Sequence, residues 1–188
     1  MSECIGLATY EAADPNAKQI RAGAAKVVEI VAEERPELVA SRLDELLPGL
    51  SVPEPQTRWM IIRTMGFCAP LNEPAAKKAL PYAERYVDAK EGLVIASSAD
   101  LFLGDLGALS KANARRTFPV LKRSMETVMK NEQDWLLEAL TKMYPKLNRA
   151  AQETALEFAG QWQNADRKST QRRARKLLAL GGMEVGDA

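Results

Sequence analysis

The feature that most constrains the fold is a set of similar apolar segments that recur at intervals of about 38 positions along the chain. The segment TRWMIIRTMG ends at Gly66, and LVIASSADLFLG ends at Gly104, one interval later. RRARKLLALG ends at Gly181, which lies about two further intervals along the chain. Because a fixed interval of this size is typical of stacked repeats, we expect the chain to fold as a repetitive array.

A second series of segments lies between the first, so that each interval holds two. Pro81 in ALPYAERYV and Pro119 in TFPVLKRSM are also one interval apart, and PELVASRLDELL and RAAQETALEFAGQW occupy the equivalent place in other intervals. The residues that dominate these segments favour helices over strands. A proline costs least in the first turn of a helix, where we expect both prolines to lie. The chain is therefore predicted to be all-α, with a repeating pair of helices.

IRAGAAKVVEIVAE and WLLEALTKM complete the first series, so that five segments recur at 37–39 positions. In this respect the chain resembles the HEAT family of helical repeats. The resemblance is carried by DPNAKQIRAGAAKVV at 14–28, by QTRWMIIRTMG at 56–66, and by Pro81 and Pro119. It implies a right-handed α-solenoid of about five antiparallel helix pairs, in which the second helix of each pair lines the concave surface. Armadillo-type packing is a close alternative, whereas tetratricopeptide repeats have a shorter interval of about 34 residues.

The predicted array forms one domain over residues 1–188. A single helix pair cannot bury its apolar face, whereas stacked neighbours share a continuous core, so the HEAT-like repeats at 15–181 are expected to fold together. Residues 1–14 are expected to form an N-terminal cap, and residues 182–188 a flexible tail.

The longest apolar run, GLVIASSADLFLGDLGAL at 92–109, is predicted to be an amphipathic helix and not a membrane span. It has the minimum length for a span but carries Asp100 and Asp105, and charges are rare inside lipid. At about 100° per residue, seven apolar side chains fall on one face. Ser97, Asp100, Leu101 and Asp105 fall on the other face, which we expect to be exposed to solvent.

The positions equivalent to this polar face in the other repeats, counted one interval at a time along the chain, define a candidate binding groove. Its residues are Trp59, Arg63, Ser97, Asp100, Trp135, Glu138, Lys142, Arg172, Arg175 and Lys176. Tryptophan and arginine are enriched at the centres of protein interfaces. Trp59 and Trp135 also fit core positions, because a large apolar side chain is commonly buried. Trp162 is expected to pack against the last repeat.

Charge is distributed unevenly along the chain, although the formal net charge is only +1. Residues 1–55 carry a net charge of −5, the middle third is neutral, and residues 111–188 carry +6. The stretch RKSTQRRARK at 167–176 holds six basic residues and no acidic ones. It is expected to begin the last helix, with Ser169 or Thr170 as the N-cap and the basic side chains facing water.

The residue types argue against several classes of chemistry. The sequence contains no histidine, which excludes histidine-dependent triads and most zinc sites, and it has no glycine-rich phosphate loop, CxxC pair or GxSxG motif. We therefore predict no cofactor and no metal, and an enzyme is the less favoured interpretation. Cys4 and Cys68 are too few for a disulfide framework, so a reducing compartment such as the cytoplasm is expected.

Two functional hypotheses follow from these features. The first is a non-catalytic interaction scaffold that binds a protein or peptide through the concave face or edge of the array. The alternative is a nucleic-acid-binding protein that contacts phosphates with the basic C-terminal third, which also holds Arg115, Arg116, Lys122 and Arg123.

A DNA glycosylase is the least favoured hypothesis. HEAT-like alkylpurine DNA glycosylases resemble this chain in architecture only, and their pattern implies an aspartate one turn after a groove tryptophan. Arg63 follows Trp59 by one turn, and Ala139 follows Trp135. No catalytic residue is therefore transferred from that family.

Overall fold

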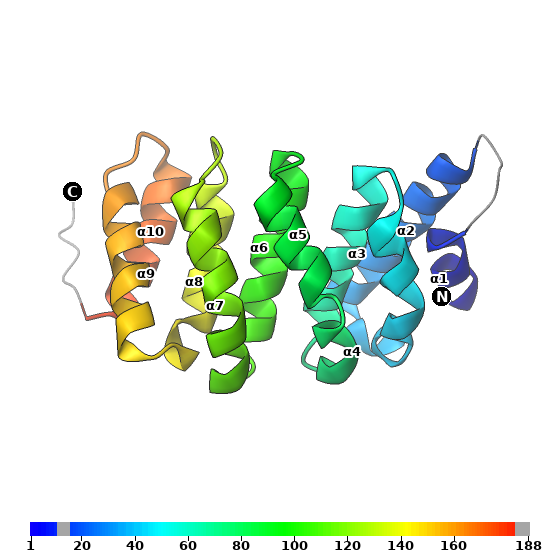
Figure 1. Cartoon of the computed structure of the whole chain (residues 1–188), viewed down its shortest axis with the longest axis horizontal. Coiled ribbons are helices and arrows are strands. Elements are labelled where there is room, and N and C mark those ends of the chain that lie inside the picture. Colours follow the sequence, from blue (N-terminus) through cyan, green and yellow to red (C-terminus); the bar gives the residue numbers. More distant parts are fainter. Residues whose placement is uncertain (11–15, 183–188) are drawn as a thin grey trace.

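The computed structural model describes residues 1–10 and 16–182, and these ranges form an all-α fold without strands (Figure 1). The expectation that the chain is all-α is therefore confirmed for these residues. Ten α-helices and three 3-10 helices occur in the described residues: α1 (Ser2–Ala8), α2 (Ala17–Glu34), η1 (Pro36–Leu38), η2 (Ala40–Ser51), α3 (Pro55–Cys68), α4 (Glu73–Lys77), α5 (Leu80–Ala89), α6 (Leu93–Gly107), α7 (Lys111–Glu126), α8 (Gln133–Met143), η3 (Tyr144–Lys146), α9 (Arg149–Trp162) and α10 (Lys168–Leu180).

The helices form two layers. The first apolar series of the sequence forms α2, α3, α6, α8 and α10, and each of these packs against the next in chain order. The second series forms η2, α5, α7 and α9, which in Figure 1 lie in front of the first layer. One continuous cluster of buried apolar side chains extends from Ile5 in α1 to Leu178 in α10.

Two local expectations are corrected. The segment PELVASRLDELL forms 3-10 helices, because Arg42 leaves the helical backbone region and Pro48 cannot donate a backbone hydrogen bond. Pro81 lies in the first turn of α5 as expected, but Pro119 lies in the interior of α7. This helix starts earlier because the Ser110 side chain caps it.

Helix α6 is buried on nearly all sides, so the expectation of a solvent-exposed polar face is wrong. The exposed fraction is 3% for Ser97, 0% for Asp100 and 7% for Leu101. The reason is that α6 packs against α3, α5, α7 and α8 at once. Helical periodicity separates two faces, but it does not reveal that neighbouring helices cover both. No helix within residues 1–10 and 16–182 is long and apolar enough to cross a membrane.

Two glycines that the sequence placed at helix ends lie inside helices, where they permit close packing. A Cβ atom on Gly104 of α6 would lie 2.6 Å from the Ala139 Cα of α8. A Cβ atom on Gly66 of α3 would lie 2.7 Å from the Asp105 Oδ2 of α6. These close approaches bring α6 within reach of polar side chains on both neighbours.

The ends of the chain are described in part. Helix α1 packs on α2 and η2, at the place expected for an N-terminal cap, although residues 11–14 of that predicted cap lie outside the described residues. Most of the predicted flexible tail, residues 183–188, also lies outside them.

We predict that Gly104→Ala destabilises the protein by about 1–3 kcal/mol, because the new methyl group overlaps the α8 backbone. Urea unfolding of the full chain, followed by circular dichroism, measures this change. Gly23→Ala in α2 is the matched control, because its Cβ meets nothing within 4 Å and the change stabilises an open helix by about 0.5–1 kcal/mol. Equal stability of the two variants would contradict the packing role of Gly104.

Candidate functional site

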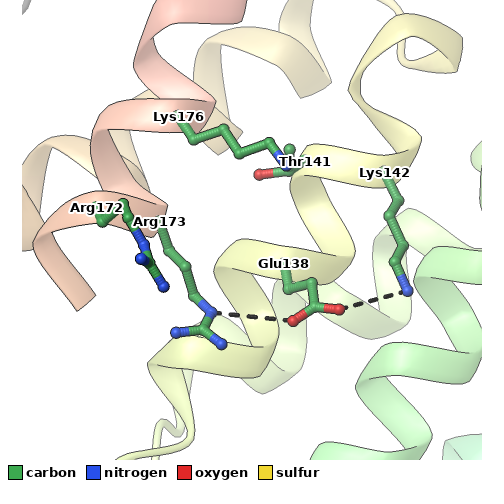
Figure 2. A pocket seen from close by; sticks show the side chains of 6 residues that line it. All are labelled: Glu138, Thr141, Lys142, Arg172, Arg173 and Lys176. Atoms are coloured by element: carbon green, nitrogen blue, oxygen red, sulfur yellow. Dashed lines mark ion pairs between the residues drawn. The ribbon is translucent and has the colours of Figure 1, made fainter. Parts of the chain in front are cut away.

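A polar pocket of about 470 Å³ lies between α8 and α10 (Figure 2). It is lined by four basic residues, one carboxylate and one hydroxyl: Lys142, Arg172, Arg173, Lys176, Glu138 and Thr141. The spacing of four residues places Glu138 and Lys142 on one face of α8. The same spacing places Arg172 and Lys176 on one face of α10, while Leu177 is buried behind them.

The acidic residue of the pocket is weakly held. Glu138 Oε1 lies 3.5 Å from Lys142 Nζ, and its Oε2 lies 3.9 Å from Arg173 Nε, so both ion pairs are long. The Thr141 hydroxyl donates a hydrogen bond to the Leu137 carbonyl oxygen at 2.6 Å. Glu138 therefore lies between two cations without a short contact to either.

Two cations of the pocket are free. Arg172 and Lys176 make no hydrogen bond or ion pair with any residue in the part of the chain that the structure describes. In Figure 2 the Lys176 side chain extends from α10 toward Thr141 of α8. Both side chains are exposed, so they can meet a ligand without first breaking an internal ion pair.

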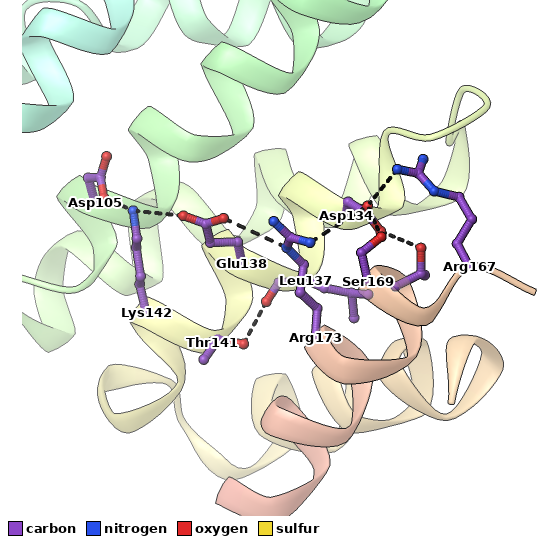
Figure 3. Close-up of polar contacts among 10 residues, drawn as sticks. Asp105, Asp134, Leu137, Glu138, Thr141, Lys142, Arg167, Ser169 and Arg173 are labelled. Atoms are coloured by element: carbon purple, nitrogen blue, oxygen red, sulfur yellow. Dashed lines mark hydrogen bonds and ion pairs between the residues drawn. The ribbon is translucent and has the colours of Figure 1, made fainter. Parts of the chain in front are cut away.

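A chain of ion pairs connects the pocket to α3 through α6 (Figure 3). Asp105 Oδ1 accepts a hydrogen bond from Lys142 Nζ at 2.7 Å, and its Oδ2 accepts one from Arg63 Nη1 at 3.0 Å. The Asp105 and Arg63 side chains are mostly buried, with exposed fractions of 14% and 11%. Asp105 therefore fixes the position of Lys142 in the pocket wall.

At the other end of the pocket, Asp134 of α8 binds the first turn of α10. It accepts hydrogen bonds from the Ser169 and Thr170 hydroxyls, and it pairs with Arg167 at 3.6 Å and Arg173 at 3.8 Å (Figure 3). The expectation that Ser169 or Thr170 caps α10 is therefore wrong, because no side chain caps this helix and Asp134 takes both hydroxyls.

The pocket and its surroundings carry an excess of positive charge. This network contains six cations and three carboxylates, which leaves three positive charges uncompensated. The cations are Arg63, Lys142, Arg167, Arg172, Arg173 and Lys176, and the carboxylates are Asp105, Asp134 and Glu138. An excess of one sign inside a concave surface concentrates ligands of the opposite sign. The site is therefore suited to an anion.

The structure brings together four of the predicted groove residues, namely Glu138, Lys142, Arg172 and Lys176. Arg63 lies outside the pocket and reaches it only through Asp105. Sequence reasoning did not include Thr141 and Arg173. The sequence indicated both in part, because Thr141 directly precedes Lys142 and Arg173 directly follows Arg172, and both neighbours were predicted groove residues.

Trp59, Trp135 and Arg175 do not line this pocket. Trp59 is half-buried against the core, with Lys26 Nζ 5.7 Å from the centre of its ring. Trp135 is half-buried on α8, and Arg175 is half-buried on α10 with its Nε enclosed and without a hydrogen-bond partner. Trp162 packs against the core as expected, with its ring edge against Phe158 at 6.2 Å between centroids.

Ser97 and Asp100, the remaining two groove residues, lie inside the protein. The Ser97 hydroxyl donates to the Leu93 carbonyl oxygen of its own helix. Both are buried, so the expectation that they line an open groove is wrong. The physical reason is the burial of α6 between its four neighbours.

A second polar cluster surrounds Asp100. Lys90 Nζ donates to Glu132 Oε1 at 2.6 Å and to Ser124 Oγ at 3.0 Å, while Glu132 Oε2 accepts from the Met129 backbone N–H at 2.7 Å. Glu132 is fully buried. Neither oxygen of Asp100 makes a hydrogen bond, although Ser124 and Glu132 lie near enough to influence it.

Burial raises the pKa of Asp100 well above its ordinary value, and the negative charge of Glu132 raises it further. The Ser124 hydroxyl and the Lys90 cation lower the pKa without reversing that effect. Asp100 is therefore a buried acid that favours its neutral form. It serves no ligand of the α8–α10 pocket, which it does not line.

Both cysteines are free, and Cys68 is fully buried. Burial raises the pKa of the Cys68 thiol to about 12, so it stays protonated and unreactive near neutral pH. In the described residues no group of three or more histidine, cysteine, aspartate or glutamate side chains is placed to hold a metal ion.

Comparison with known protein families finds no family model that matches this chain, and comparison with curated proteins finds no match either. The functional argument therefore depends on the geometry and charge of the pocket.

We predict that Asp100 makes the protein less stable as the pH rises. The native state holds the Asp100 proton between the ordinary pKa of 3.8 and about 8, where the unfolded chain releases it, so the free energy of unfolding falls with rising pH across this window. Asp100→Asn and Asp100→Leu are expected to remove a slope of up to about 1 kcal/mol per pH unit.

Urea unfolding of the full chain at several pH values from about 5 to about 8 measures that slope. Asp44→Asn is the control, because the Asp44 side chain is exposed and should leave the slope unchanged. The account of Asp100 fails if both Asp100 variants keep the full slope of the original protein.

Proposed function

We propose that the chain is a short right-handed α-solenoid of HEAT-like helix pairs. The support is the spacing of its polar contacts. Within the described residues, the side-chain hydrogen bonds between residues more than 11 positions apart span 32–42 positions, from Arg21 with Glu54 to Thr170 with Asp134. Contacts confined to one repeat interval are expected when each repeat touches only its neighbours.

We propose that this solenoid is a non-catalytic interaction scaffold that binds an acidic segment of a partner protein in the α8–α10 pocket. The observation that carries the proposal is the pair of free cations, Arg172 and Lys176, inside a concave site with excess positive charge. A charged donor and a charged acceptor form hydrogen bonds about twice as strong as neutral ones. Acidic side chains of a peptide supply such acceptors.

The pocket is preorganised on its α8 side. Asp105 holds Lys142 at 2.7 Å, so this cation loses little side-chain freedom when a ligand arrives. Arg172 and Lys176 are on a helix whose Ala174 and Leu177 are fully buried, so its backbone is fixed as well. Binding is expected to weaken with salt, because the free cations are exposed.

The nucleic-acid alternative has less support. Arg115, Arg116, Lys122 and Arg123 are on α7, in the other helix layer, so they do not extend the α8–α10 pocket. Arg123 is also paired with Asp88 at 3.0 Å. The basic C-terminal third is therefore divided between two layers, whereas binding to a phosphate backbone requires a continuous basic surface.

The proposal predicts that the double variant Arg172→Ala/Lys176→Ala binds a short peptide of glutamate and glycine at least about tenfold more weakly, because charge-assisted hydrogen bonds are lost. Fluorescence anisotropy of the labelled peptide with the full chain, at low and high salt, measures the affinity. The matched control is Arg116→Ala/Lys122→Ala, which removes the same two residue types from exposed positions on α7.

The control is expected to change the affinity by less than about twofold, because its two charges lie outside the pocket. An equal loss in both double variants indicates attraction by net charge alone and overturns the assignment of the pocket. Circular dichroism of each variant checks that the fold is retained.

A further inference from the structure

We infer that the group bound in the α8–α10 pocket is a phosphate monoester dianion, carried by the partner peptide as phosphoserine or phosphothreonine. This inference rests on the proposed function and names its ligand more closely. Three features of the pocket carry it: the size of the charge excess, the position of the donors on two helices, and the weakly held Glu138.

The charge excess fits a dianion better than a single carboxylate. The pocket itself has four cations and one carboxylate, and the wider network keeps the same excess of three positive charges. A carboxylate would compensate one of these charges. A phosphoserine carries about −1.5 to −2 charges near neutral pH and compensates about two.

The donors approach the pocket from two helices. Arg172 and Lys176 lie one turn apart on α10, and Lys142 lines the pocket from α8, with Glu138 between it and Arg173 (Figure 2). A phosphate monoester presents three acceptor oxygens in different directions, so one group can contact both helices at once. A planar carboxylate presents two oxygens and suits a single arginine better.

Glu138 acts as an internal competitor for the ligand. Its two ion pairs, 3.5 Å to Lys142 and 3.9 Å to Arg173, are too long to be strong. A dianion that enters the pocket can attract both cations away from Glu138, while Asp105 still holds Lys142 in place. Removing the charge of Glu138 should therefore strengthen anion binding, which a structural role for this residue would not predict.

The test uses the full chain and four probes: a phosphoserine peptide, the same peptide with glutamate in place of phosphoserine, inorganic phosphate as a competitor, and a short single-stranded oligonucleotide. The phosphoserine peptide is expected to bind about tenfold more tightly than the glutamate peptide. Its affinity is expected to fall as the pH drops from about 7 to about 5, because the phosphate takes up its second proton near pH 6.

Three variants complete the test. Glu138→Gln is expected to raise the affinity for the phosphoserine peptide about threefold or more, because it removes the carboxylate charge that repels the phosphate. Arg172→Ala/Lys176→Ala is expected to abolish the preference for phosphoserine, and the α7 control Arg116→Ala/Lys122→Ala is expected to retain it.

The outcomes distinguish the inference from the proposed function. Equal binding of the phosphoserine and glutamate peptides overturns the inference and leaves the acidic-peptide scaffold in place. Binding of neither peptide overturns both. Inorganic phosphate that binds as tightly as the phosphopeptide assigns the pocket to the free ion and overturns the peptide ligand. An oligonucleotide that binds more tightly and displaces the phosphopeptide overturns it in favour of nucleic acid.

Discussion

The close packing of α6 between α3 and α8 is the constraint on which the rest of the structure depends. Gly104 permits the approach of α8, because a side chain there would overlap the Ala139 backbone, and Gly66 leaves room for the Asp105 carboxylate beside α3. As a result α6 is buried on nearly all sides, and its Asp105 lies within reach of Arg63 and Lys142. The same packing that completes the core therefore also fixes one wall of the charged pocket.

The carboxylates beside the pocket divide its cations into two groups. Asp105 holds Lys142 in position at 2.7 Å, and Asp134 lies 3.8 Å from Arg173, so both cations are partly neutralised. Arg172 and Lys176 receive no such partner in the described residues. Since a fully paired surface would attract little, the uneven distribution of carboxylates is the physical basis of the anion binding that we propose.

Much of the fold was predictable from the sequence, whereas the site was predictable only in part. The recurring segments located α2, α3, α6, α8 and α10, because helical periodicity and apolar content are local properties. The spacing of four residues brought Glu138 and Lys142, and Arg172 and Lys176, onto single helix faces. Asp100 was misplaced, because periodicity alone cannot show that four neighbouring helices cover α6.

The sequence by itself determined that the chain is helical, where its main helices lie, and that its C-terminal third is basic. Only the tertiary structure decided which basic residues are free, because pairing depends on carboxylates from other helices. Asp134 reaches Arg167, Ser169 and Thr170, more than 30 positions away in sequence. Such contacts follow from how the helices stack, so the local pattern of RKSTQRRARK could not reveal that Arg172 and Lys176 face an open pocket beside Glu138.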